Sequence, residues 1–166
     1  DRELNCEKIS VAAFATSLAD VVEPKAGNAC VDFVREIPED LGEFEVDAGV
    51  LSSALVNILE NAVEACATDK AKPDHAVRLG VQNDGPDVVI TVADNGTGMS
   101  QETSEKMFTL FFSSKGDRGT GLGLFIANQV IEKHGGNITV NSTLRQGTTF
   151  TIRLPRKLAE AAKRCD

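Results

Sequence analysis

The sequence contains few of the residues that build metal, redox or nucleic-acid sites. It has four cysteines (Cys6, Cys30, Cys66 and Cys165) and only two histidines in 166 residues. The cysteines show neither the paired spacing of a metal site nor a redox motif, so we expect reduced thiols in a cytosolic protein. Lysine and arginine form no cluster and the net charge is −8, which argues against a nucleic-acid partner.

Long apolar runs and a secretory leader are also missing. We therefore expect a cytoplasmic chain that does not itself insert into a membrane, although a parent protein anchored through other segments stays open. With 42% hydrophobic residues, a chain of this length can bury about two-thirds of its unfolded surface around one core.

The segment Met107–Leu124 places Lys115 and three alternating glycines, Gly119, Gly121 and Gly123, directly before an apolar helical pattern. A helix N-terminus offers unpaired N–H groups and a positive dipole end, and glycines let a phosphate approach them. The loop lacks the Gly-Lys-Ser/Thr ending of a P-loop, and Leu124 replaces the third glycine of a dinucleotide fingerprint. Lys115 precedes the glycines, which predicts a lid over bound phosphates; a tight loop without a ligand is the alternative.

A second pattern is the apolar strand Val88–Ala93, which ends in Asp94 and is followed by Gly96 and Gly98. The Asn-Gly pair would suit a hairpin, but the residues that follow are polar and begin a helix at Ser100 rather than a returning strand. An ionised carboxylate only accepts hydrogen bonds, so Asp94 suits the amino group of adenine and disfavours guanine.

A third pattern lies on the helix expected after Asp47, its N-cap. Its apolar stripe predicts the core face and consists of Leu51, Leu55, Ile58, Leu59, Ala62 and Cys66. The opposite face carries Asn57, Asn61 and Glu64, with Glu60 beside them. Interior asparagines cost about half a kcal/mol or more relative to alanine, so two on one face suggest a function, and an amide oxygen suits Mg²⁺. An ordinary solvated face is the alternative.

Together these patterns resemble the ATP-binding domain of sensor histidine kinases, in the superfamily that also holds type II topoisomerases, mismatch-repair ATPases and heat-shock chaperones. Leu55–Ala65 looks like the N box, Asp94–Met99 like the first glycine box, Met107–Lys115 like the phenylalanine box and Gly119–Leu124 like the second glycine box. The end of the chain, from Glu132 to Gly136 and from Gly147 to Pro155, is also similar to such kinases.

The resemblance implies ATP and Mg²⁺ as cofactors, with Asn61 as the metal ligand, Asn57 near the phosphates and Asp94 on adenine. Asn57, Asn61 and Lys115 would be the catalytic residues. The full set of ATP-binding positions that it implies is Asn57, Asn61, Glu64, Asp94, Gly96, Gly98, Met99, Phe108, Lys115, Gly119, Thr120, Gly121, Leu122, Gly123, Leu124 and Thr148. We expect Phe108 to position the lid by packing rather than to contact adenine.

The reaction class follows from one departure from the superfamily. Members that hydrolyse ATP resemble this sequence but carry a glutamate where Asn57 stands, and a neutral amide cannot act as a general base. The expected reaction is γ-phosphoryl transfer to a histidine, catalysed mainly by positioning and Mg²⁺. His75 and His134 lie outside any acceptor-like helix, so we expect the acceptor on a dimerising hairpin, upstream of Asp1 or on another protein.

The resemblance also implies relay to the aspartate of a response-regulator receiver domain, a homodimeric parent protein and a monomeric isolated domain. A module of the same fold that senses nucleotide without transferring phosphate is one alternative. An ATPase of the topoisomerase or chaperone type is another, disfavoured by Asn57 and by the short lid between Phe108 and Gly119.

The expected fold is α+β: a two-layer α/β sandwich with a mixed, mostly antiparallel sheet covered on one face by helices, called the Bergerat fold in this superfamily. Residues 1–155 would form the catalytic ATP-binding domain, and 156–166 a helical tail or linker. The expected helices are Val11–Val22, the one after Asp47 and Leu122–His134, the last with Leu122, Phe125, Ile126 and Val130 on one face. The expected strands are Ala29–Glu36, Ala76–Gln82, Val88–Ala93, Asn137–Ser142 and Thr148–Leu154.

Overall fold

A five-stranded mixed sheet forms one layer of the molecule in the computed structural model, which describes residues 3–107 and 123–157. The strand order is β2-β4-β5-β7-β6, with β2 parallel to β4 and every other pair antiparallel. The strands are β2 (Asp32–Glu36), β4 (Ala76–Asp84), β5 (Asp87–Asp94), β6 (Asn137–Thr143) and β7 (Gly147–Pro155).

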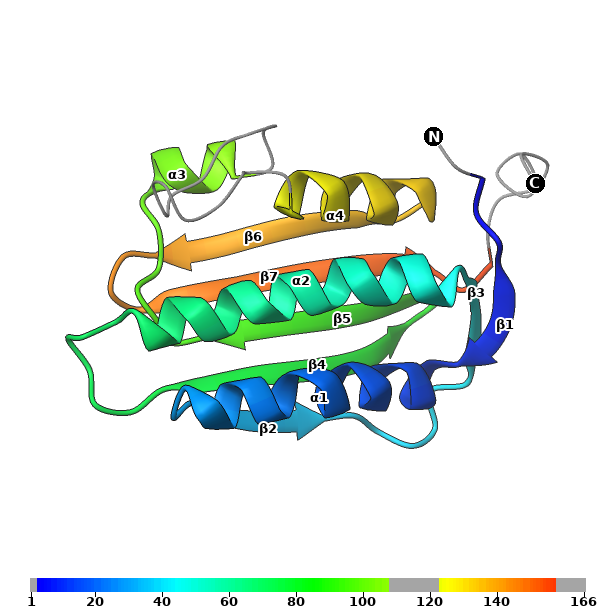
Figure 1. Cartoon of the computed structure of the whole chain (residues 1–166). Helices are drawn as coiled ribbons and strands as arrows, with labels where there is room; N and C mark the ends of the chain where they lie inside the picture. The colour runs from blue at the N-terminus through cyan, green and yellow to red at the C-terminus, as the bar shows by residue number, and fades with distance from the viewer. Residues whose placement is uncertain (1–2, 108–122, 158–166) are drawn as a thin grey trace.

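Three helices form the second layer and lie side by side over one face of this sheet (Figure 1). They are α1 (Val11–Asn28), α2 (Ala48–Ala67) and α4 (Gly123–Lys133). A short helix, α3 (Gln101–Lys106), follows β5, and the side chain of Ser100 caps it by accepting from the Thr103 N–H at 3.2 Å. The two-layer α+β sandwich with helices on one face is thus confirmed.

The central helix α2 begins where the sequence predicts. Asp47 is its N-cap and accepts from the Val50 N–H at 3.4 Å. All six residues of the predicted apolar stripe are buried, joined by Ala54 and Val63. By length and mean hydropathy of 1.3 this helix could also cross a membrane, contrary to the expectation that no segment would qualify. Its apolar side is explained by packing against the sheet of a folded domain.

A second, two-stranded sheet was not predicted. Strand β1 (Glu7–Ser10) pairs antiparallel with β3 (Glu43–Val46) just before α1 and α2 begin. Each strand has only four residues, although Phe44 and Val46 of β3 alternate with glutamates and are buried, and the partners are far apart in the sequence. The Arg156 carbonyl accepts from the Glu45 N–H at 2.9 Å, which ties the end of the main sheet to β3.

Several predicted boundaries need correction. Helix α1 continues past Val22 to Asn28 with Pro24 inside it, so β2 begins at Asp32 and not at Ala29. Strands β4, β5 and β7 are each two residues longer than predicted, and β6 is one residue longer. On α4 the buried residues are Ala127 and Ile131, whereas Ile126 is 49% exposed, so the predicted apolar face was wrong for Ile126.

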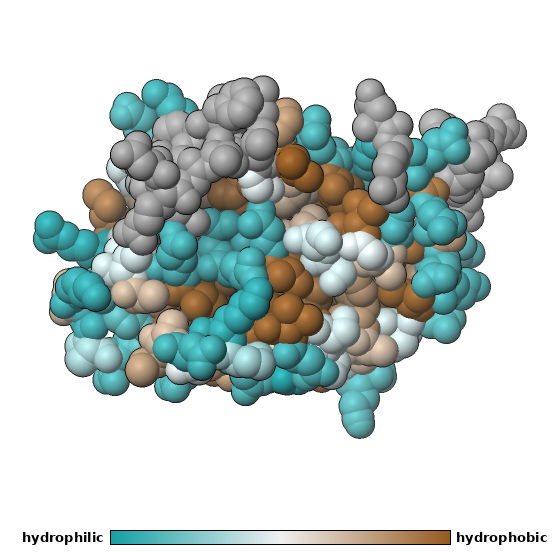
Figure 2. Space-filling view, in the orientation of Figure 1, coloured by the Kyte–Doolittle hydropathy of each residue, from teal (hydrophilic) through white to brown (hydrophobic). Residues whose placement is uncertain are grey.

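The helical face of the molecule mixes hydrophilic and hydrophobic side chains (Figure 2). Among the described residues the exposed large hydrophobic side chains are Val21, Ile126 and Leu144, which come from α1, α4 and the turn between β6 and β7. They are isolated in the sequence and on different elements, as is ordinary for a folded surface.

Candidate functional site

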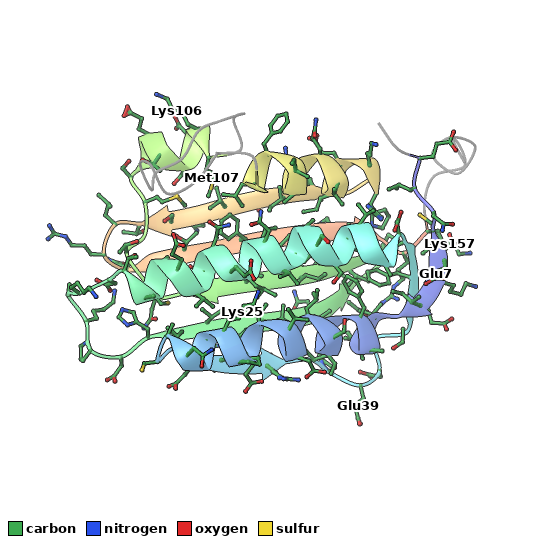
Figure 3. The ribbon with its side chains drawn as sticks, viewed as in Figure 1. Glu7, Lys25, Glu39, Lys106, Met107 and Lys157 are labelled. Atoms are coloured by element: carbon green, nitrogen blue, oxygen red, sulfur yellow. The ribbon has the colours of Figure 1, made fainter. Side chains whose placement is uncertain are left out.

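The polar face of α2 is the first part of the site. Asn57, Asn61 and Glu64 are half-buried there, and the Asn61 amide nitrogen donates to the Asn57 carbonyl oxygen at 2.8 Å. Glu60 lies on the side of α2 that faces α1, where it forms an ion pair with Lys25 of α1. Figure 3 shows Lys25 at the junction of the two helices. Glu60 therefore links helices, and the two asparagines face the space toward α4.

The N-terminus of α4 meets this polar face. A Cβ added to Gly123, the first residue of α4, would lie 2.5 Å from Asn57 Nδ2 and 3.0 Å from its Oδ1. Any larger residue at position 123 would have to displace the Asn57 side chain, so glycine allows this approach of the helix start to Asn57. Leu124 is partly buried against the core and anchors the same turn. The structure thus brings the N box and the end of the second glycine box into contact, as the resemblance implies.

Asp94 ends β5, in register with Val77 of β4 and Thr148 of β7. Its Oδ1 accepts from the Gly96 N–H at 2.8 Å. Burial raises the pKa of Asp94 to about 6, against the lowering effects of hydrogen bonds to the Gly96 and Thr148 backbone and of the charges on Lys72 and His75. The carboxyl group is thus held inside the molecule and is mostly ionised at neutral pH.

Gly96 and Gly98 are required by close backbone contacts around Asp94. A Cβ on Gly96 would lie 2.5 Å from the carbonyl carbon and oxygen of Ala65 in α2. Gly98 has φ +67°, and a Cβ there would lie 2.0 Å from the Thr143 carbonyl oxygen. These glycines let the turn after Asp94 lie directly on α2 and on the end of β6.

Ser142 of β6 connects two predicted site positions, Met99 and Thr148, and no motif in the sequence had singled it out. Its Oγ accepts from the Met99 N–H at 2.8 Å and donates to the Gly147 carbonyl oxygen at 3.1 Å. It also lies 2.8 Å from the hydroxyl of Thr148, which is buried. Met99 and Thr148 are thereby held on opposite sides of one hydroxyl group, at the same end of the sheet as Asp94.

The remaining predicted positions fall outside the described residues. These are Phe108, Lys115, Gly119, Thr120, Gly121 and Leu122. Of the described positions, Asn57 meets the start of α4. Asp94, Gly96, Gly98, Met99 and Thr148 gather at the adjoining end of the sheet.

The two histidines are structural, as expected. His134 is 1% exposed; its Nδ1 donates to the Val130 carbonyl oxygen at 2.8 Å, and its Nε2 accepts from the Asp47 N–H at 3.0 Å. It therefore joins the end of α4 to the start of α2. His75 Nε2 lies 2.8 Å from Asp69 Oδ2, and both side chains are less than 10% exposed.

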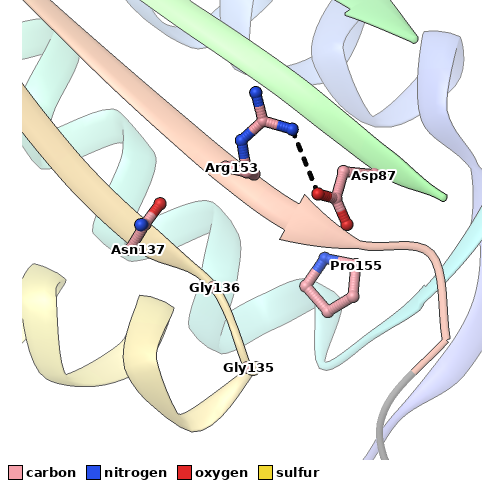
Figure 4. Close-up of a pocket in the computed structure, with 6 residues that line it drawn as sticks. All are labelled: Asp87, Gly135, Gly136, Asn137, Arg153 and Pro155. Atoms are coloured by element: carbon pink, nitrogen blue, oxygen red, sulfur yellow. Dashed lines mark hydrogen bonds and ion pairs between the residues drawn. The ribbon is translucent and has the colours of Figure 1, made fainter. Parts of the chain in front are cut away.

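An open cavity of about 140 Å³ lies at the other end of β5 from Asp94. Asp87 and Arg153 form part of its wall and are joined by an ion pair of 3.1 Å (Figure 4). Arg153 also pairs with Asp84 at 2.7 Å. The guanidinium of Arg153 is already paired with two carboxylates, and two glycines form another part of the wall. This cavity therefore has few free polar groups for a ligand, and it is separate from the site around Asn57 and Asp94.

Comparison with known proteins decides the family. Residues 46–158 match the family described as "Histidine kinase-, DNA gyrase B-, and HSP90-like ATPase". The chain belongs to this family. Its members related to sensor kinases include the signal transduction histidine-protein kinase AtoS of Escherichia coli, 32% identical over 154 residues. Sporulation kinase B of Bacillus subtilis is 36% identical over 112 residues, which are 68% of this chain.

Solved structures agree with this family assignment. The catalytic domain of histidine kinase ThkA superposes with a TM-score of 0.78 at 26% identity, covering 93% of this chain and 99% of that one. Full-length ShkA, solved in complex with AMPPNP, gives a TM-score of 0.79 at 25% identity and covers 97% of this chain. This histidine kinase catalytic domain therefore has the Bergerat fold and the class of a transferase.

The histidine kinase domain is only part of the relatives' length. The matched segment spans 93% of this chain but 24% of AtoS, and 68% of this chain but 25% of sporulation kinase B.

Proposed function

We propose that this domain binds ATP with Mg²⁺ and transfers the γ-phosphoryl group to a histidine on a dimerising hairpin outside this chain. The hairpin would pass the group to an aspartate of a response-regulator receiver domain. The observation that carries the proposal is the contact between Asn57 on the polar face of α2 and Gly123 at the start of α4. A helix N-terminus beside two amide side chains suits a bound triphosphate.

Asp94 is proposed to bind the adenine. Its carboxylate accepts hydrogen bonds and is partly buried, so the exocyclic amino group of adenine would gain a charge-assisted bond there, whereas the oxygen of guanine would face a repelling acceptor. Gly96, Gly98, Met99 and Thr148 form the surrounding wall.

Asn61 is the proposed metal ligand. Its amide nitrogen is engaged with the Asn57 carbonyl, so the amide oxygen is the ligand atom. The described residues contain no cluster of three or more histidine, cysteine or acidic side chains that could hold a metal. Mg²⁺ needs no such cluster, because it commonly takes one or two protein oxygens, several waters and substrate phosphates. The residues present therefore fit Mg²⁺ brought in with ATP, where it would neutralise phosphate charge.

Transfer to histidine rather than to water follows from what the chain places beside the phosphates. Asn57 holds its position on α2 without a titratable proton, so it can orient a phosphate oxygen but cannot activate water. Glu64 lies nearly two turns further along α2, close enough to contribute to the wall of the site. The predicted lid residues Lys115 and Gly119–Leu122 would close over the triphosphate in this proposal.

The proposal places the domain in the cytoplasm, as part of a homodimeric sensor kinase, with the isolated domain a monomer. Nucleic acid is not a proposed partner, because the net charge of the chain is −8.

The test is transfer of the labelled γ-phosphate of ATP, with Mg²⁺, to a separately supplied hairpin of the parent protein. We expect acid-labile, base-stable label on the hairpin, lost when its acceptor histidine is changed to glutamine. Bound ATP without transfer to a folded hairpin would favour the nucleotide-sensing module. Release of inorganic phosphate without labelled hairpin would favour an ATPase.

A further inference from the structure

Lys72, in the loop between α2 and β4, reaches three separate segments next to Asp94. Its Nζ donates to the Arg145 carbonyl oxygen at 2.7 Å and to the Gly96 carbonyl oxygen at 3.3 Å. It also lies 3.4 Å from Asp69 Oδ2, and its side chain is 31% exposed. One ammonium group thus joins the end of α2, the turn after β5 and the turn between β6 and β7.

The Gly96 contact connects Lys72 to the proposed adenine carboxylate. Gly96 donates its N–H to Asp94 Oδ1 at 2.8 Å, and its carbonyl accepts from Lys72. The peptide groups on both sides of Gly96 are therefore fixed by side chains. A displacement of Gly96 would move the N–H that orients Asp94.

The Arg145 contact closes the other side of the turn. Arg145 has φ +69°, a left-handed conformation that non-glycine residues rarely adopt. It is held there by its own N–H, which donates to the Thr97 carbonyl at 2.6 Å, and by its carbonyl, which accepts from Lys72. Residues 96 and 97 are thereby connected to the β6–β7 turn twice, once through Lys72.

Lys72 is itself held in place by the loop that carries it. Asp69 accepts from the Ala71 N–H at 3.0 Å and lies 2.8 Å from His75, and these bonds lower the pKa of Asp69 to about 2. Asn95 ties the same loop to the turn, because its Oδ1 accepts from the Ala76 N–H at 2.9 Å. The loop is thus a fixed support beneath the turn.

Charge adds to this geometry. The groups that face Asp94 are Cys66 from α2 and Lys72 and His75 from the loop. Lys72 and His75 both lower the pKa of Asp94, against the burial that raises it. The neighbouring thiol stays neutral, because burial and the charge of Asp94 raise the pKa of Cys66 to about 11. Removing the charge of Lys72 would therefore raise the pKa of Asp94, so that the carboxylate would be protonated closer to neutral pH.

We propose that Lys72 is a positioning residue for adenine recognition, holding the Gly96 turn and the ionised Asp94 carboxylate in the arrangement that accepts from the amino group of adenine. The inference rests on the proposed role of Asp94 in ATP binding. Lys72 itself acts through Gly96 and Asp94 and need not touch the nucleotide.

The test measures Mg²⁺-ATP affinity of Lys72→Met from pH 5.5 to pH 8 by calorimetry. Lys70→Met is the matched control: it removes the same charge from the same loop, and Lys70 is exposed, with no hydrogen bond or ion pair in the part of the chain that the structure describes. Each variant is also measured with an ATP analogue that lacks the adenine amino group. Asp94→Asn provides the reference for titration of ATP itself.

We expect Lys72→Met to weaken ATP binding about tenfold at pH 7, as the loss of a charge-assisted bond implies. For Lys72→Met we also expect the midpoint of the pH dependence of ATP affinity to move to higher pH, and the preference for ATP over the analogue without the amino group to fall. Lys70→Met should bind ATP as the wild type does. Lys72→Gln keeps a donor for the two carbonyl groups but removes the charge, so it should shift the midpoint with a smaller loss of affinity.

Two results would overturn the inference. One is an ATP affinity of Lys72→Met and Lys72→Gln that equals the affinity of the wild type at every pH. The other is an equal loss at every pH with the midpoint and the amino-group preference unchanged, since that would make Lys72 a merely structural residue. Failure of the wild type to bind ATP at all would instead contradict the proposed function, so the two failures are distinguishable.

Discussion

Gly96→Ala tests whether the turn after Asp94 must lie directly on α2. The added Cβ would be 2.5 Å from the carbonyl carbon and oxygen of Ala65 and 2.7 Å from the Cys66 nitrogen. These are backbone atoms of the last turn of α2, so no side-chain rotation can relieve the contact. The turn has to move outward by about 1 Å to reach an ordinary contact distance.

The magnitude follows from what the movement disrupts. Overpacking of this kind costs roughly 1–3 kcal/mol, and the Thr97 N–H bond to the Ala65 carbonyl, 3.2 Å long, is lost with it. For a chain of this size each kcal/mol lowers the melting temperature by about 2–4 °C. We therefore expect Gly96→Ala to melt about 2–12 °C below the wild type. ATP affinity should fall as well, because the Gly96 N–H orients Asp94.

The assay is thermal unfolding by circular dichroism together with calorimetry of Mg²⁺-ATP binding. Gly49→Ala is the control, because Gly49 lies in the first turn of α2 and an added Cβ there would meet nothing within 4 Å. That change should leave binding intact and raise stability by up to about 1 kcal/mol. Unchanged melting temperature and affinity of Gly96→Ala would refute the close contact between the turn and α2.

Three further predictions follow from the site and its supports. Asn61→Ala should retain the wild-type melting temperature but lose Mg²⁺-dependent ATP affinity by about tenfold or more, measured by titration with and without EDTA. Normal phosphoryl transfer to the hairpin by the folded variant would contradict the assignment of Asn61 as the metal ligand. Asn57→Glu should raise the release of inorganic phosphate from ATP, and an unchanged rate would mean that geometry, more than the missing base, keeps water unreactive. Burial lowers the pKa of His134 below its ordinary 6.5. The contribution of neutral His134 to the free energy of unfolding should therefore be fully present above about pH 6.5 and decrease as the pH falls below that value. His134→Gln should weaken this part of the pH dependence in urea unfolding between pH 7.5 and pH 5.5, and an identical slope would contradict the role of His134.

The elements that the sequence predicted well are those whose signals are local. Asp47 and the apolar stripe from Leu51 to Cys66 lie within one helix, so periodicity and capping were sufficient to define α2. The same holds for β5 and for the cap at Ser100. In these segments the residue pattern and the tertiary environment agree.

The features that were missed depend on partners far along the chain. Strands β1 and β3 have only four residues each and are stabilised by pairing with each other across some thirty-five residues. Helix α1 continues through Pro24, which local propensity disfavours, and Ala26 beyond it is buried in the core. Ile126 repeats with the right spacing for the apolar face of α4, yet the helix is rotated so that Ala127 and Ile131 face inward.

The candidate site shows the same division. Asn57, Asn61 and Asp94 could be chosen from motifs, because family resemblance reports residues that contact the ligand. Ser142 and Lys72 support those residues through hydrogen bonds to backbone atoms, and such bonds leave no pattern in the sequence around them. The supports of the site could be found only once the fold had placed them.

The most direct test of the central claim is a heteronuclear NMR titration of the domain with Mg²⁺ and a non-hydrolysable ATP analogue. We expect the largest amide shifts at Asn57, Asn61, Gly96, Gly98 and Gly123, where α2, the turn after β5 and the start of α4 meet. Shifts confined to the cavity near Arg153 at the other end of the sheet, or no shifts at saturating nucleotide, would contradict it.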